Sequence, residues 1–330
     1  MLTRVADIGE RAVIQQMMKY LTPMPGMPIP FWDDASGLSL GDGRALVINT
    51  DMLVWETDVP TGMTPFQAAR KAVVMNISDL GAKGVQPLAF LPNIGIPPDY
   101  PVKDVVEMAK GFEAGAREYD AYVVGGDTNE ACDVIISGSA LGIVDEKTIM
   151  KRAGGVKPGH IVAVTGRFGL TSMGFMNLLE GVDLTSNTKT AALESIYKPI
   201  ARVEEGIALA KTGAVTSCID SSDGLSVSLY DLRRSTGLGF VIHDLPIHPL
   251  ASKFAAQKAI DPIRVTMNGG EEYELIYTYP PEKEAKIKAT LSKVGCSHIR
   301  IGVVTERKDI VYQQNEELIP IRKGGWEHFK

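Results

Sequence analysis

Aspartates in short apolar or glycine-rich surroundings are the residues of this chain best suited to chemistry. They lie in the motifs WDDAS, NTDML, NISDLG, GGDTN and CIDSSDG, as Asp33, Asp34, Asp51, Asp79, Asp127, Asp220 and Asp223. A carboxylate in such surroundings is costly to bury, because an isolated buried charge shifts its pKa and becomes neutral. Hard divalent cations such as Mg²⁺ take oxygen ligands and keep waters or phosphates in their other positions. The pattern therefore favours a divalent-cation site that faces a phosphorylated ligand.

Asp79 is the clearest of these residues. It lies on a helix predicted over residues 64–84, where it shares one face with Asn76 and has mostly apolar neighbours. A cap or a salt bridge to Lys71 or Lys83 would also explain a carboxylate there. We favour a metal ligand, because other aspartates also stand next to apolar strand segments.

Asp51 and Asp127 each follow an apolar run, LVINTD and YVVGGD, so we expect both at strand ends. Open α/β sheets bind their ligands at such ends. Gly126 has no side chain and would let a main-chain N–H approach a phosphate closely. A simple turn remains the alternative for GGD, and also for Asp33–Asp34.

Asp220 and Asp223 flank a predicted strand–turn–helix junction. Ser222 or Asp223 could cap the helix that follows. Capping and ligand binding are compatible, because a helix N-terminus also attracts phosphate.

Strands and helices alternate on both sides of a basic, glycine-rich segment, residues 151–160. The alternation predicts an α/β (α+β) fold with two domains, residues 1–148 and 149–330. In the first domain we expect helices at 1–16, 64–84 and 102–120, and strands at 44–54, 85–97, 121–127 and 133–144. In the second we expect helices at 170–180, 193–211, 226–236 and 282–295, and strands at 160–166, 215–220, 239–244, 271–279 and 298–306.

Composition narrows the function further. The formal net charge of −6 argues against a nucleic-acid-binding face. No apolar run reaches the ~18 residues of a membrane helix, and we expect a cytoplasmic protein. The three cysteines are too widely spaced for a zinc or disulfide framework. Neither a GxxxxGK[ST] loop nor a GxGxxG after a strand is present, so a nucleotide would bind through metal-bridged phosphates.

Taken together, the motifs resemble those of the thiamine-monophosphate kinase family. WDDAS, NTDMLV, KAVVMNISDLGAKGVQP, VVGGDTN, KRAGGVKPGHIVAVTGRFG, CIDSSDGL, NGGEEYEL and GGWEHF follow in that family's order, from about residue 7 to residue 330. The wider superfamily also contains aminoimidazole ribonucleotide synthetase, selenophosphate synthetase and a hydrogenase maturation factor.

This resemblance implies a two-domain aminoimidazole ribonucleotide synthetase-like fold whose N-terminal domain forms the core of a homodimer. It also implies ATP-dependent phosphorylation of thiamine monophosphate to thiamine diphosphate, the last step in making that coenzyme. The transfer would be direct and in line, with ATP as co-substrate and several Mg²⁺ ions assisting. We nominate no general base, because a phosphate acceptor is already ionised near neutral pH.

The resemblance also assigns residues. It implies metal ligation by Asp34, Thr50, Asp51, Asp79, Asp127, Asp220 and Asp223. It implies nucleotide contacts from Gly126, Asp127, Arg152 and Ser222, and substrate contacts from Asp58, Glu271 and Trp326. Trp326 could stack on an aromatic or cationic ring, or could anchor the core.

Four segments depart from the family pattern, among them CIDSSDGL, where Ser221 is a substitution outside the metal ligands. TDMLVWETDVP places Asp58 where a histidine is common, and a carboxylate there could favour the cationic thiazolium. PFWDD replaces GIGDD, and Glu272 replaces an aspartate. Two alternative functions remain. One is a related ATP-using enzyme with another substrate, and the other is a non-catalytic protein that binds Ca²⁺ structurally.

Overall fold

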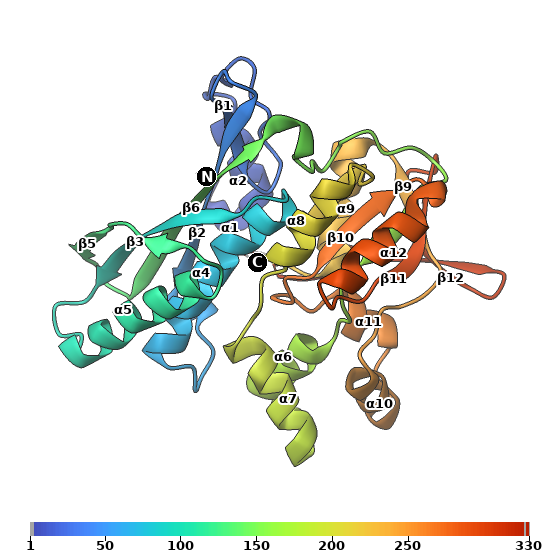
Figure 1. The fold of residues 1–330 in the computed structure, drawn as a ribbon. Helices are drawn as coiled ribbons and strands as arrows, with labels where there is room; N and C mark the ends of the chain where they lie inside the picture. The colour runs from blue at the N-terminus through green and yellow to red at the C-terminus, as the bar shows by residue number, and fades with distance from the viewer. Residues whose placement is uncertain (1–2, 327, 330) are drawn as a thin grey trace.

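Two sheets, one from each half of the chain, organise the molecule (Figure 1). The computed structural model describes residues 3–326 and 328–329. The first sheet has six strands in the order β1-β2-β6-β3-β4, with β5 paired to β3. The second has seven, in the order β13-β12-β9-β11-β7-β10-β8. The predicted mixture of helices and sheets is confirmed, and the predicted boundary at 148/149 lies between β6 and β7.

The first sheet is built on a long antiparallel pair. Its strands are β1 (Ser36–Ser39), β2 (Arg44–Val54), β3 (Pro87–Ile96), β4 (Tyr122–Val123), β5 (Asp127–Glu130) and β6 (Ile135–Asp145). β2 and β6 pair along their whole length, from Arg44↔Asp145 to Val54↔Ile135. Side chains alternate between the two faces, so Ala45, Val47, Asn49, Asp51 and Leu53 share one face of β2.

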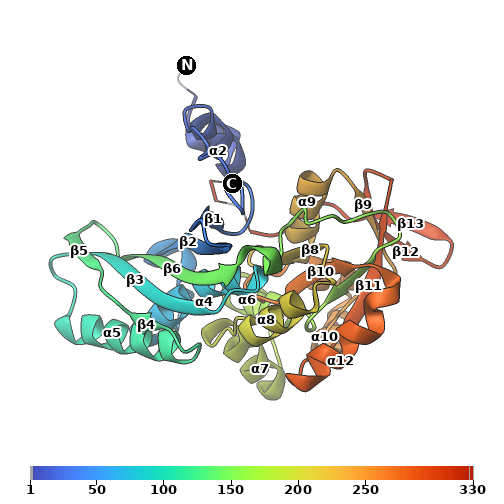
Figure 2. The same cartoon turned by 45° about the horizontal axis from the view of Figure 1, so that its top comes forward.

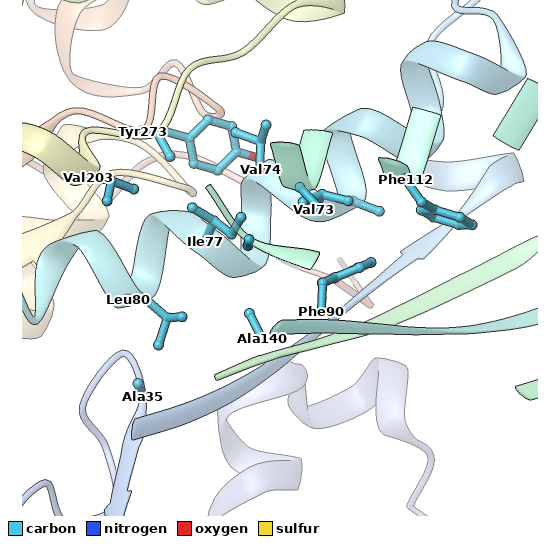
Figure 3. Packing of buried hydrophobic residues seen from close by; sticks show 14 of the residues in the cluster. Ala35, Val73, Val74, Ile77, Leu80, Phe90, Phe112, Ala140, Val203 and Tyr273 are labelled. Carbon is cyan, nitrogen blue, oxygen red and sulfur yellow. The ribbon is translucent and has the colours of Figure 1, made fainter. Parts of the chain in front are cut away.

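Two helices, α4 (Pro65–Ala82) and α5 (Val102–Arg117), cover that face (Figure 2). α4 starts as predicted, with Pro65 at its first position and a reciprocal capping box between Thr64 and Gln67. Val73, Ile77 and Leu80 of α4 pack in the core with Phe90 and Phe112 (Figure 3). The two helices approach closely because α5 has Gly111, where a Cβ would lie 2.2 Å from the Phe66 carbonyl oxygen.

The second sheet is more deeply buried. Its strands are β7 (Ile161–Val164), β8 (Ser217–Asp220), β9 (Gly239–Ile242), β10 (Leu275–Tyr279), β11 (Ile299–Thr305), β12 (Ile310–Gln314) and β13 (Glu317–Pro320). The helices around it are α6 (Leu170–Glu180), α7 (Ser186–Tyr197), α8 (Val203–Thr212), α9 (Leu225–Thr236), α10 (Pro249–Lys258), α11 (Pro262–Met267) and α12 (Glu284–Lys293). Every residue of β7, β8, β9 and β10 is buried, which explains their apolar, weakly alternating sequences.

Helix α4 also joins the two units, since it packs against β2 and β6 on one side and against α8 and β8 on the other. The contact with α8 depends on small residues. A Cβ at Gly206 would lie 2.0 Å from the Gly81 carbonyl oxygen. The residues of α4 are therefore placed between the two sheets, where both units can supply partners.

The structure corrects three of the predicted elements. The N-terminal helix is interrupted at Gly9, whose φ is 76°, and becomes α1 (Val5–Ile8) and α2 (Glu10–Met18). The predicted helix over 193–211 is the end of α7 and most of α8, separated around Pro199, which cannot donate a helix hydrogen bond. The predicted strand over 271–279 begins only at Leu275, because Glu271 and Tyr273 adopt left-handed φ values.

Several elements were not predicted. They are β1, β5, β12, β13, α10, α11, the one-turn helix α3 (Trp55–Asp58) and two short 3₁₀ turns, Glu146–Thr148 and Pro281–Lys283.

Within the described residues, none of the helices has the length and apolar character needed to cross a membrane.

Candidate functional site

Three predicted metal ligands converge between the two units. Carboxylate oxygens of Asp34, Asp79 and Asp220 all lie within 4.8 Å of one another. Asp34 precedes β1, Asp79 is on α4 and Asp220 ends β8, so the cluster draws on both halves of the chain. We call these three residues the carboxylate cluster.

Asp51 lies beside this cluster. Burial and then the charge of Asp34 raise the pKa of Asp51 to about 6. Its main-chain N–H donates to the side-chain oxygen of Asn76 on α4, at 3.1 Å. The strand predicted over residues 44–54 is confirmed as β2, and Asp51 therefore lies inside it and not at a strand end as expected. It reaches the cluster because it is on the sheet face that α4 covers.

Asp79 is held by a hydrogen bond and, within the described residues, not by an ion pair with lysine or arginine. Asn49 donates its side-chain N–H to an Asp79 oxygen at 2.8 Å. Burial raises the pKa of Asp79 well above its ordinary value, and the charges of Asp51, Asp220 and Asp34 raise it further. The alternative of a salt bridge to Lys71 or Lys83 is wrong, since those lysines pair with other carboxylates.

The two aspartates of the DSSDG turn behave in the same way. Burial and the charge of Asp34 raise the pKa of Asp220 to about 7, against a hydrogen bond from the Ser78 hydroxyl at 2.5 Å. Burial, Glu10 and Asp231 raise the pKa of Asp223 to about 6. Within the described residues, no ion pair with lysine or arginine is formed by Asp51, Asp79 or Asp220.

Asp33 and Asp34, in contrast, have counter-ions. The Lys83 ammonium lies 2.6 Å from Asp34 Oδ2 and also contacts Asp33. The Arg152 guanidinium donates to Asp34 Oδ1 at 2.9 Å through Nε, and its main-chain N–H donates to Asp33 at 3.0 Å. Burial alone would lower the pKa of Lys83, but the two aspartates raise it above its ordinary value. Arg152, predicted to contact the nucleotide, thus also anchors the loop that carries Asp34.

The donor set fits a hard divalent cation. Among the described residues the cluster offers carboxylate oxygens, and burial together with the charges of neighbouring aspartates raises the pKa of Asp51, Asp79 and Asp220. Mg²⁺ and Ca²⁺ prefer oxygen ligands, whereas zinc and copper sites use histidine or cysteine. A bound cation would offset the repulsion and keep the carboxylates ionised at neutral pH.

The predicted substrate residues Glu271 and Trp326 meet at the DSSDG turn. The main-chain N–H of Glu271 donates to the Ser222 carbonyl oxygen at 2.6 Å, and that of Trp326 donates to the Asp223 carbonyl oxygen at 3.3 Å. The Trp326 side chain is about half exposed, at 48%. The turn that carries Asp223 therefore also positions two residues predicted to contact the substrate.

Asp58 is linked to this group through a lysine. One Asp58 carboxylate oxygen accepts from the Val54 N–H at 2.8 Å, at the start of α3. The Lys71 ammonium donates to the Asp58 carbonyl oxygen at 3.0 Å and to the Glu271 carboxylate. Glu271 and Trp326 therefore contact the DSSDG turn directly, and Asp58 is joined to it through Lys71 and Glu271.

Asp127 is not brought to the carboxylate cluster. It is exposed at the start of β5, opposite Asn93 of β3. Asn93 in turn pairs with Ser137, and Ser137 with Met52. Three strand spacings separate Asp127 from Met52, or roughly 14 Å at ~4.8 Å per strand. Its metal and nucleotide roles stay predictions.

Thr50 and Gly126 also lie apart from the cluster. The Thr50 hydroxyl donates to the Gly138 carbonyl oxygen at 2.7 Å, on the sheet face opposite Asp51. Gly126 has a packing role of its own, since a Cβ there would lie 2.2 Å from the Pro92 carbonyl oxygen. The geometry therefore does not direct the Thr50 side chain towards the metal site.

Sequence reasoning missed several residues that support the site. Asn49 and Ser78 hydrogen-bond the carboxylates, and Lys83 neutralises the Asp34 loop. Asn49 stands two positions before Asp51, and Ser78 directly precedes Asp79. Polar residues at these positions of an otherwise apolar strand and helix were a signal available in the sequence.

The N-terminal helix α2 borders the site as well. Arg11 forms a bidentate ion pair with Asp231, at 2.5 and 3.1 Å, and Asp231 lies 3.7 Å from Arg152. Next to Arg152 is a cavity of about 500 Å³, whose lining includes Gln15 and Trp32. The cavity gives a sizeable ligand room beside the loop of Asp34.

Comparisons with known proteins identify the family of the chain. The family description "AIR synthase related protein, N-terminal domain" matches residues 32–144, and "AIR synthase related protein, C-terminal domain" matches residues 157–314. The thiamine-monophosphate kinase of Pyrococcus horikoshii is 37% identical over 300 residues, covering 90% of each chain. That of Nitrosopumilus maritimus is 32% identical over 285 residues, covering 86% of this chain and 89% of the relative.

Solved structures share the fold. The protein tt0281 from Thermus thermophilus superposes with a TM-score of 0.86 and 29% identity, covering 97% of this chain and 100% of that one. AaThiL complexed with AMPPCP and TMP has a TM-score of 0.84 at 24% identity, covering 99% of both chains. The chain therefore belongs to the thiamine-monophosphate kinase family, within the AIR synthase related proteins.

Proposed function

We propose that the protein is a kinase that phosphorylates thiamine monophosphate with ATP and forms thiamine diphosphate, the last step in making that coenzyme. The observation that carries the proposal is the carboxylate cluster, Asp34, Asp79 and Asp220, with Asp51 beside it and no internal counter-ion for Asp51, Asp79 or Asp220 within the described residues. The relatives from Pyrococcus horikoshii and Nitrosopumilus maritimus are thiamine-monophosphate kinases, and AaThiL, which has the same fold, was solved in complex with AMPPCP and TMP.

The cluster suits a reaction between two phosphorylated molecules. Two unit charges at 4 Å repel by about 4 kcal/mol at an effective dielectric of 20, so ATP and a phosphate acceptor need neutralisation to meet. Bound Mg²⁺ would supply that neutralisation. Asp34, Asp79, Asp220 and Asp51 would hold the cations, and we propose that more than one ion is bound.

The chain's own residues would align the two substrates. Arg152 fixes the loop of Asp34 on one side of the cluster, beside the cavity of about 500 Å³ that offers space for the nucleoside part of ATP. The DSSDG turn fixes Glu271 and Trp326 on the acceptor side. An in-line transfer between these sides needs positioning more than proton transfer, and we assign no general base.

A homodimer is part of the proposal. The sheet face opposite α4 and α5 presents Met52, Leu88 and Ile143 to solvent, with 57, 44 and 39% of their surfaces exposed. An apolar sheet face of this kind favours burial against a second copy of the chain. Light scattering of the purified protein, which measures its molar mass in solution, tests for the dimer.

We expect the enzyme to work in the cytoplasm, where ATP is available.

The test of the proposed function is direct. The purified chain is incubated with Mg²⁺, ATP and thiamine monophosphate, and thiamine diphosphate and ADP are measured. We expect both products in equal amounts, with no diphosphate when Mg²⁺ is chelated. Absence of both products, together with ATP-dependent turnover of aminoimidazole precursors or of another phosphate acceptor, would overturn the proposal in favour of a sibling enzyme.

A further inference from the structure

Lys71 of α4 is a fully buried cation whose partners are both in segments predicted to hold the substrate. Its exposed fraction is 0%. Its ammonium donates to the main-chain carbonyl of Asp58, at 3.0 Å, and to Oε1 of Glu271, which is 200 residues away in sequence. Lys71 thus joins the end of α3 to the loop before β10.

A buried ammonium needs compensation, because removing it from water without partners is strongly unfavourable. The carbonyl and the carboxylate provide this compensation. Lys83, the other fully buried lysine of this part of the chain, instead contacts Asp33 and Asp34 beside the carboxylate cluster. The two lysines therefore serve different groups, and Lys71 is not a counter-ion of the metal site.

The loop that receives Lys71 is strained. Glu271 has a φ of 63° and Tyr273 a φ of 51°, values that non-glycine residues rarely adopt. Such backbone persists only when its surroundings fix it. Here the N–H groups of Glu271 and Tyr273 donate to the carbonyls of Ser222 and Ser221, at 2.6 and 2.9 Å, and Lys71 fixes the side chain.

The Glu271 carboxylate retains one free acceptor. Oε1 accepts from Lys71, whereas Oε2 is buried and has no hydrogen-bond partner among the described residues. An unpartnered buried oxygen is costly unless a ligand supplies the donor. The loop therefore presents one carboxylate oxygen in a fixed orientation to a ligand with an N–H or O–H group.

We infer that Lys71 is a positioning residue for the phosphate acceptor: it holds Glu271 so that Oε2 accepts a hydrogen bond from an N–H of the substrate. The amino group on the pyrimidine of thiamine monophosphate is a donor of this kind. This inference rests on the proposed function. It adds to that function a residue that acts through Glu271 and does not itself contact the metal cluster.

The same helix offers a matched control. Arg70, next to Lys71, is also buried, at 8% exposure, and it also pairs with one glutamate and one carbonyl, Glu118 and Pro199. Neither partner belongs to a predicted substrate segment. Replacing Arg70 therefore removes a comparable buried cation and leaves the acceptor side unchanged.

The experiment compares Lys71→Met with Arg70→Met by steady-state kinetics and thermal melting. Both variants should melt at lower temperatures. Only Lys71→Met should raise the KM for thiamine monophosphate, by at least about tenfold, while its KM for ATP stays within about twofold. An unchanged KM for thiamine monophosphate, or equal rises in both KM values, would overturn the inference.

A double variant tests whether Lys71 acts through Glu271. Lys71→Met/Glu271→Gln leaves no unpaired charge, so it can fold even where Lys71→Met alone does not. Its KM for thiamine monophosphate should match that of Glu271→Gln within about twofold, because coupled residues are non-additive. A KM well above that of Glu271→Gln would contradict the inference. Turnover by the wild-type protein is measured first, so that failure of the proposed function is distinguished from failure of this inference.

Discussion

Asp34 and Asp79 contribute oxygens to the same cluster, yet only one of them is neutralised by the protein. Asp34 is paired with Lys83 and Arg152. Asp79 receives one amide hydrogen bond from Asn49; burial, and then the charges of the surrounding aspartates, raise its pKa. The difference separates Asp34, a predicted metal ligand that also anchors the fold through ion pairs, from Asp79, whose charge is left for a cation from solution.

The C-terminal end of helix α4 carries both the residue that neutralises Asp34 and a carboxylate that has no counter-ion among the described residues. Lys83 follows directly after α4 and neutralises the loop of Asp33 and Asp34, while Asp79 and Ser78 face the uncompensated group. Lys83 and Asp79 both lie between the two sheets, but they serve different carboxylates. We therefore expect replacement of Lys83 to lower stability and replacement of Asp79 to lower activity.

The largest expected effect is on stability. Lys83→Met leaves Asp33 and Asp34 buried near Arg152 alone, and breaking a buried pair in this way costs about 3–5 kcal/mol. Denaturant unfolding at neutral pH measures the loss. Lys110→Met is the matched control, since Lys110 forms an exposed pair with Glu107 and should change stability by no more than about 1 kcal/mol. Equal losses in both variants would show that the Asp34 loop does not depend on Lys83.

The next effect is on catalysis. Asp79→Asn should reduce turnover at least about a hundredfold, on the scale of losing one electrostatic stabiliser, while the folded structure is kept. Turnover with saturating ATP and thiamine monophosphate is the measurement, with circular dichroism to verify folding. The exposed Asp99 provides the control, and Asp99→Asn should keep wild-type turnover. Wild-type rates in Asp79→Asn would remove this residue from the metal site.

A smaller effect distinguishes the two kinds of carboxylate by pH. A carboxyl whose pKa is raised by folding contributes most to stability below its ordinary pKa of 3.8, and that contribution is lost as pH rises through the folded values of about 6 for Asp51 and about 7 for Asp220. Without metal, Asp79→Asn lacks one repelling charge. It should melt a few degrees above the wild type at about pH 7.5, with a smaller difference near pH 4.5.

Melting curves in the presence of a chelator at both pH values test this. The difference between variant and wild type should disappear when Mg²⁺ is added, because the cation stabilises only the wild-type cluster fully. A variant that is less stable than the wild type at both pH values, without metal, would mean that Asp79 is not repelled by its neighbours.

The sequence predicted the three members of the cluster among a larger set that also held Thr50 and Asp127, which lie apart from it. Asp79 stands out because a carboxylate on an apolar helix needs a reason, whereas Asp220 was assigned mainly through the family resemblance. The first residues of the helix that carries Asp79 are equally predictable, since Thr64 and Pro65 are strong local signals. Local patterns of this kind depend only on neighbouring residues.

The counter-ions could not be predicted in the same way. Lys71 and Glu271 are 200 positions apart, and Arg152 and Asp34 are 118 apart, so their pairing depends on how the two units pack. The alternation in EEYELIYTY predicts a strand that includes Glu271. The left-handed φ of Glu271 prevents this, and nothing in the sequence pattern indicates it. The break at Pro199, by contrast, was visible in the sequence.

The central claim is that the uncompensated carboxylates bind Mg²⁺. The most direct measurement is a calorimetric titration of Mg²⁺, in the presence of AMPPCP, into the wild type and Asp79→Asn at about pH 7.5 and about pH 5. The account predicts that the wild type binds Mg²⁺ at the higher pH and more weakly at the lower one, where Asp51 and Asp220 are protonated, and that Asp79→Asn loses at least about tenfold in affinity. Equal affinities for both proteins, unaffected by pH, would contradict it.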